Sequence, residues 1–134
     1  MNYVIDCSFS SALFLPDEKS GHVQDFFLNL KNNDQVFIPL LWWYETNNVL
    51  NVAVKRNRLK QNDVFSIINL FNELKLVTDY EYGIAWSKTL FELTKIYHIS
   101  SYDAAYLELA LRIKAKLVTL DSMLKNAAVK MGID

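Results

Sequence analysis

Four acidic residues share one property: each lies beside or within an apolar segment, where an unpaired carboxylate is costly. They are Asp6, Glu45, Asp103 and Asp121. Brought together, ionised carboxylates repel by about 3 kcal/mol per pair at ~5 Å and an effective dielectric of ~20. Such a cluster takes up protons or binds cations. Because every ligand is an oxygen, the chemistry indicated is binding of one or two hard ions, Mg²⁺ or Mn²⁺.

A site of this kind implies a substrate that contains phosphate. Mg²⁺ usually keeps several waters and completes its shell with phosphate oxygens. Such an ion activates a water, orients it in line with the bond to be broken and stabilises charge on the leaving oxygen. The expected reaction is phosphodiester hydrolysis, which requires no covalent protein nucleophile.

Each acid also has a purely structural explanation. Asp121 sits between a strand and a helix, where Asp is a favoured N-cap. Asp103 follows Ser100 at capping-box spacing, and acids are favoured in a first helical turn. Asp6 has the alternative role of a turn acid, and Glu45 that of an acid at the edge of an apolar face that reaches water.

The hydrophobic pattern predicts the elements that position these acids. The expected strands cover residues 3–5, 35–38, 76–78 and 117–120. The expected helices cover residues 8–15, 17–31, 40–57, 61–74, 82–97, 100–110 and 122–130, the last capped by Gly132. Strands that alternate with helices, in a chain too short for a barrel, predict a three-layer α/β sandwich with a mainly parallel sheet. Sites in such sheets form outside the carboxyl ends of the strands, where Asp6 and Asp121 fall.

The bulk composition narrows the class of protein. The chain has 134 residues, of which 51% are hydrophobic, and no linker or repeat, so one domain over residues 1–134 is expected. Cys7 is the only cysteine, which excludes an internal disulfide. The first residues lack a secretory signal, and the most apolar run, residues 37–44, is shorter than the ~20 residues of a membrane span. A cytoplasmic protein without a membrane segment is therefore expected.

The net charge of −1 gives the chain no overall attraction for RNA, so phosphates must be held locally. The only dense basic run contributes four candidate RNA contacts: Lys55, Arg56, Arg58 and Lys60. A solvated helix end that complements the helix dipole is the alternative explanation of this run. The apolar helices of so small a chain suggest a homodimer.

Taken together, several segments make the chain resemble a PIN domain, and within that family the VapC-type ribonuclease toxins of toxin-antitoxin pairs. They are Asp6-Cys7-Ser8, the helix from Glu45 to Leu50, the helix from Tyr102 to Ala110, and Leu117 to Asp121. The resemblance implies a divalent-metal-dependent endoribonuclease in which Asp6, Glu45, Asp103 and Asp121 bind the metal. It also implies supporting roles for Ser8, Asn48 and Thr119, which would hold the ligating carboxylates in place. A cognate antitoxin is expected to neutralise the enzyme. An antitoxin arginine that enters the acidic site could do so, because a guanidinium pairs with carboxylates.

Two other classes of function compete with the nuclease. A catalytically silent PIN-like module would use its cleft or its apolar faces to bind a protein partner. A receiver-like phosphoacceptor domain fits less well, because Glu45 lies on a helix and no lysine ends a late strand. The PIN family usually continues past the last helix into another strand, whereas Ile133-Asp134 ends this sequence, which leaves a fifth strand open.

Overall fold

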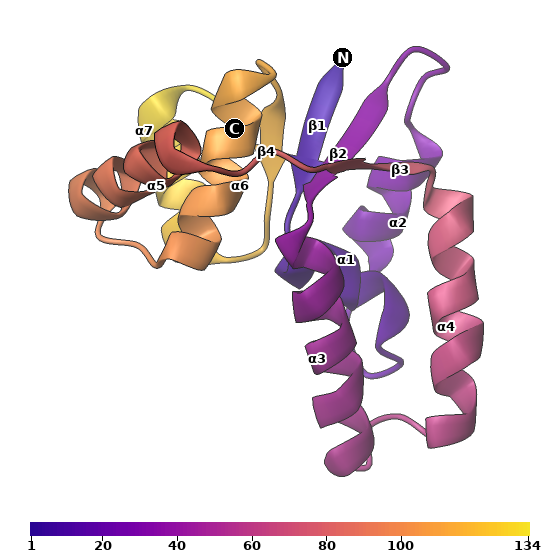
Figure 1. Cartoon of the computed structure of the whole chain (residues 1–134). Coiled ribbons are helices and arrows are strands. Elements are labelled where there is room, and N and C mark those ends of the chain that lie inside the picture. Colours follow the sequence, from indigo (N-terminus) through magenta and orange to yellow (C-terminus); the bar gives the residue numbers. More distant parts are fainter.

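Four parallel strands form the centre of the fold (Figure 1). The computed structural model describes all residues, 1–134. The strands are β1 (Asn2–Ile5), β2 (Gln35–Pro39), β3 (Leu76–Asp79) and β4 (Lys116–Val118), in the order β3-β2-β1-β4. The sheet is all-parallel, which confirms the predicted α/β class.

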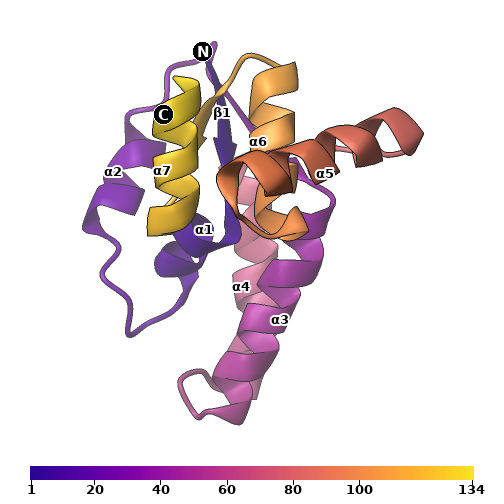
Figure 2. The same cartoon turned by 90° about the vertical axis from the view of Figure 1, so that its left-hand side faces the viewer.

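Seven α-helices flank this sheet. They are α1 (Cys7–Phe14), α2 (Gly21–Leu28), α3 (Leu41–Lys55), α4 (Val64–Leu70), α5 (Ile84–Tyr97), α6 (Ser101–Arg112) and α7 (Ser122–Met131), with short 3₁₀ turns η1 (Gln61–Asp63) and η2 (Phe71–Leu74) around α4. In Figure 2, α2 and α7 lie on one side of β1, and α5 and α6 lie on the other. None of the helices combines the length and the apolar content that a membrane crossing requires.

Several expected elements differ at their ends, and the fifth strand that the sequence left open is absent. The helix expected from Asp17 begins only at Gly21, because Asp17 and Glu18 instead pair with Arg58 from a turn. The single helix expected over 61–74 is an α-helix tightened to 3₁₀ at both ends. No strand follows α7, although the Leu117 N–H donates to the Ile133 carbonyl at 2.6 Å.

Helix α3 is anchored to the core through Trp42, whose side chain is fully buried. The Trp42 indole N–H donates to the Ser10 hydroxyl of α1 at 2.9 Å, which provides the partner that a buried indole needs. Its ring also packs against Phe71 at a centroid distance of 5.1 Å. Since α3 starts directly after β2, this anchor determines where Glu45 lies at the carboxyl end of the sheet.

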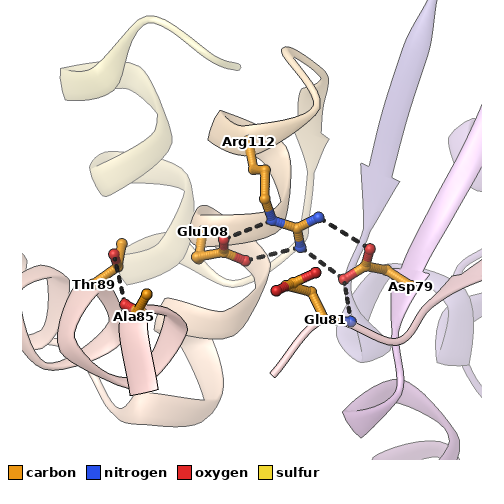
Figure 3. Close-up of polar contacts among 6 residues, drawn as sticks. All are labelled: Asp79, Glu81, Ala85, Thr89, Glu108 and Arg112. Carbon is orange, nitrogen blue, oxygen red and sulfur yellow. Dashed lines mark hydrogen bonds and ion pairs between the residues drawn. The ribbon is translucent and has the colours of Figure 1, made fainter. Parts of the chain in front are cut away.

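Arg112 links the end of β3 to α6 (Figure 3). Its guanidinium makes two hydrogen bonds to Glu108, at 2.8 and 3.1 Å, and two to Asp79, at 3.1 and 2.7 Å. The Glu108 side chain is only 8% exposed and that of Asp79 is 20% exposed. Paired and forked contacts of this kind offset the cost of burying the carboxylates.

We expect Arg112→Ala to destabilise the protein by about 2 kcal/mol, allowing for partial exposure of the site, because it leaves a nearly buried carboxylate without a cation. The melting temperature should fall by roughly 6–8 °C, measured by calorimetry. The double variant R112A/E108Q should regain part of the loss. Arg58→Ala is the matched control, since its acidic partners are exposed, and it should change the melting temperature little.

Candidate functional site

Asp6 follows β1 directly and is held by three donors. Its side chain is 5% exposed and accepts hydrogen bonds from the Phe9 N–H at 3.0 Å and the Thr119 hydroxyl at 2.6 Å. The Ser8 hydroxyl lies 2.9 and 2.8 Å from the two carboxylate oxygens. Asp6 is therefore the N-cap of α1, yet a carboxylate offers about four lone-pair directions, so capping does not exclude a metal.

The register between β1 and β4 explains why Thr119 reaches Asp6. Ile5 pairs with Val118, which brings the residues that follow them level at the carboxyl end of the sheet. The Thr119 hydroxyl also accepts from the Asp121 N–H at 2.9 Å. Asp121 in turn caps α7 by accepting from the Leu124 N–H at 2.8 Å, so its expected capping role is present.

Glu45 is oriented by Tyr106, a residue that the sequence did not single out for this purpose. The Tyr106 hydroxyl donates to Glu45 Oε1 at 2.5 Å, and the tyrosine is 1% exposed. Tyr106 lies one helical turn after Asp103 on α6. A tyrosine hydroxyl on an apolar helix face needs a hydrogen-bond partner. This requirement could have indicated from the sequence that Tyr106 contacts a polar group.

Asp103 lies in the first turn of α6, as its capping-box spacing predicts. Its backbone N–H donates to the Ser100 hydroxyl at 3.1 Å, so Ser100 is the N-cap. Its carboxylate takes part in no ion pair, and the same holds for the other three acids, because the ion pairs of the chain use other carboxylates.

Electrostatic repulsion acts between most pairs of the four acids. Burial raises the pKa of Asp6, and repulsion from Asp121 adds to that rise. Burial also raises the pKa of Glu45, with further contributions from Asp103 and Asp6. For Asp103, burial raises the pKa and the charges of Asp121 and Asp6 raise it further. Every pair among the four acids except Glu45 and Asp121 therefore repels, as expected for carboxylates near the carboxyl end of one parallel sheet.

The donor set fits a hard, water-rich ion better than a tightly enclosed one. No three Asp, Glu, His or Cys side chains lie close enough to hold an ion between them. Mg²⁺ needs only one or two protein carboxylates, because it keeps several waters. Carboxylates with raised pKa values and no cationic partner are the groups that gain most when such an ion binds.

Two expected supporting residues contact Asp6, and a third does not. Ser8 and Thr119 hydrogen bond to Asp6, as described above. Asn48 is exposed on α3, and the hydrogen bond that orients Glu45 comes from Tyr106. Among the basic candidates, Arg58 is bound to Asp17 at 2.7 Å, whereas Lys55, Arg56 and Lys60 are exposed and form no ion pair.

We expect Tyr106→Phe to raise the dissociation constant for Mn²⁺ about 10- to 100-fold, because residues that orient a metal ligand contribute about this much. Isothermal titration of the metal into the purified protein measures the change. Tyr97→Phe on α5 is the control, since Tyr97 lies outside the acidic cluster, and it should bind Mn²⁺ like the wild type. Equal affinities for all three proteins would show that the Tyr106 contact does not position Glu45.

The fold is an all-parallel α/β sheet with mutually repelling carboxylates near its carboxyl end. The PIN domain family model matches residues 3–130, and the chain belongs to the PIN domain family. It is 29% identical over 125 residues to Ribonuclease VapC3 of Pyrobaculum aerophilum, which covers 92% of both chains. The crystal structure of PAE2754 from Pyrobaculum aerophilum shares the fold, with a TM-score of 0.67 and 18% identity, over 100% of this chain and 91% of that one.

Proposed function

We propose that this protein is a divalent-metal-dependent endoribonuclease of the VapC type, the toxin of a toxin-antitoxin pair. The observation that carries the proposal is that a PIN domain brings Asp6, Glu45, Asp103 and Asp121 from separate segments to positions where most pairs repel. The similarity to Ribonuclease VapC3 supports RNA as the substrate. We further propose that it acts in the cytoplasm as a homodimer and is neutralised by a cognate antitoxin.

In this proposal Asp6, Glu45, Asp103 and Asp121 bind one or two Mg²⁺ or Mn²⁺ ions. The ion supplies Lewis-acid activation of a water molecule and of the phosphate. The chain's own residues keep the ligands in place: Ser8 and Thr119 hold Asp6, and the Tyr106 hydroxyl holds Glu45. Holding the ligands in this way restricts the number of orientations available to Asp6 and Glu45 before an ion binds.

Cleavage of labelled RNA in the presence of Mg²⁺, Mn²⁺ or EDTA tests the nuclease part of the proposal. Cleavage with either metal and none with EDTA is the expected result. Failure of the folded wild type to cleave any of a varied set of RNAs would favour the alternative, a catalytically silent PIN-like module that binds a protein.

Expression in bacteria tests the toxin part. We expect the wild type to arrest growth and the product of the adjacent small reading frame to relieve the arrest when co-expressed. Because an antitoxin arginine can pair with the carboxylates, relief should depend on a basic residue of that partner. Normal growth during expression of soluble, RNA-cleaving protein would contradict a toxin role.

A further inference from the structure

Helix α3 carries one exposed polar stripe that begins beside the acidic site. The stripe consists of Tyr44, Asn48, Asn51 and Lys55, all of them exposed, and Tyr44 is 72% exposed. Spacings of four, three and four residues place these side chains on one helix face. Tyr44 adjoins Glu45, and Lys55 lies about 16 Å further along the helix axis. The stripe therefore leads from the proposed cleavage site to the basic end of α3.

The side chains of the α3 stripe suit single-stranded RNA. An exposed tyrosine ring offers a face on which an unpaired base can stack. The Asn48 and Asn51 amides each donate and accept hydrogen bonds, as base edges require. The Lys55 ammonium forms no ion pair and is available for a phosphate. Trp43, Tyr44, Asn47, Asn48 and Asn51 also line a hollow of about 510 Å³.

Three asparagines in the middle of an exposed helix face are unusual. Asparagine is a poorer helix former than Ala, Lys or Glu, because its side chain competes for backbone hydrogen bonds. Asn47, Asn48 and Asn51 are all exposed within α3, so helix stability and core packing do not account for them. A ligand that is read by amide groups does.

The charge of the α3 stripe beyond Tyr44 differs from that of a neighbouring hollow. That hollow, of about 570 Å³, lies between the start of α3, the segment before α5, α5 itself and α6. It shares Tyr44 with the stripe and includes Asp79, Glu81 and Glu108. Arg112 is the only cation bound to these acids, through Asp79 and Glu108. This hollow therefore repels phosphates. The α3 stripe carries no acid and ends in Lys55, which Arg56 follows in the sequence.

We propose that the α3 stripe binds the single-stranded RNA segment next to the cleaved bond. The base closest to the acidic site stacks on Tyr44, the next lie against Asn48 and Asn51, and a phosphate meets Lys55. The inference rests on the proposed ribonuclease function and adds how a chain of net charge −1 holds its substrate. The α3 stripe would thus supply locally the RNA contacts that an overall basic surface supplies in other proteins.

The test measures the affinity of a fluorescein-labelled single-stranded RNA of mixed sequence by anisotropy, in EDTA so that no metal-dependent cleavage occurs. The variants are Tyr44→Ala and the double variant N51A/K55Q. The matched control is N126A/K130Q, which makes the same two changes at the same spacing on exposed positions of α7. Replacement of Asn by Ala raises helix propensity, so a loss of binding cannot be attributed to a weaker helix.

We expect both stripe variants to raise the dissociation constant about tenfold, and N51A/K55Q to lower the slope of log affinity against log salt by about 0.7, the effect of one lost phosphate contact. The α7 control should bind like the wild type. If the wild type binds RNA and the stripe variants bind it as tightly as the control does, RNA binding by the α3 stripe is overturned and the ribonuclease proposal stays intact. A wild type that neither binds nor cleaves RNA would overturn both, and stripe variants that lose only a protein partner would reassign the surface.

Discussion

Asp103→Asn should reduce RNA cleavage by about 10³-fold or more while the protein stays folded. Loss of a ligand should exceed the about 10- to 100-fold effect of residues that only orient ligands. The change is nearly isosteric, and the backbone N–H of residue 103 still donates to Ser100 as it does now. Cleavage of labelled RNA with Mg²⁺ or Mn²⁺ measures the loss.

Asp25→Asn is the matched control, because Asp25 is an exposed acid on α2. It should cleave RNA at the wild-type rate. Equal rates for Asp103→Asn and the wild type, with circular dichroism showing both proteins folded, would remove Asp103 from the active site and with it the proposed mechanism.

Divalent metal should raise the melting temperature strongly, and the size of this effect should depend on pH. At a free Mn²⁺ concentration about 100 times the dissociation constant, binding stabilises the folded state by about 2.7 kcal/mol, or roughly 10 °C for a domain of this size. Protons compete for carboxylates whose pKa values are raised by burial and mutual repulsion. The shift should therefore shrink as the pH falls from neutral toward the ordinary carboxylate range.

Without metal, these carboxylates should make the folded protein less stable as the pH rises. An acid whose pKa is raised in the folded state destabilises that state once it is ionised. This loss of folding free energy is absent below the pKa of the unfolded chain and complete above the raised pKa of the folded protein. Stability from this source is lost as the pH rises through that window. Asp103→Asn in EDTA should then melt at a higher temperature than the wild type near neutral pH, and the difference should vanish at acidic pH.

Differential scanning fluorimetry across pH, with and without Mn²⁺, measures both trends. Asp17 and Asp34 supply an opposite trend in both proteins, because a hydrogen bond from Arg58 lowers the pKa of Asp17, and one from the N-terminal ammonium lowers the pKa of Asp34. Subtracting the Asp103→Asn profile from the wild-type profile removes this shared background. A difference that stays constant with pH would contradict the coupled acidic cluster.

The order of the strands along the chain and the placement of Asp6 and Asp121 could be predicted from sequence. Short β-prone runs that end in acids, separated by helices, leave few arrangements other than a parallel sheet with those acids at its carboxyl end. The position of Asp103 in the first turn of α6 could be predicted for a similar reason, because Ser100 marks the start of that helix. These inferences use only local pattern and the general rules of α/β sheets.

Contacts between distant residues could not be predicted in the same way. Tyr106 and Glu45 are 61 positions apart, and Arg58 and Asp17 are 41 apart. Such pairs depend on how helices pack over the sheet, and no local pattern encodes that packing. For this reason the sequence suggested Arg58 as an RNA contact and gave no indication that Tyr106 would bind Glu45.

A crystal soaked with Mn²⁺ and recorded at the manganese absorption edge tests the central claim most directly. We predict an anomalous peak at the carboxyl end of the sheet, within coordination distance of at least one of Asp6, Glu45, Asp103 and Asp121, and its loss in Asp103→Asn. A wild-type crystal with no peak near these carboxylates, or with peaks only elsewhere on the surface, would contradict the account.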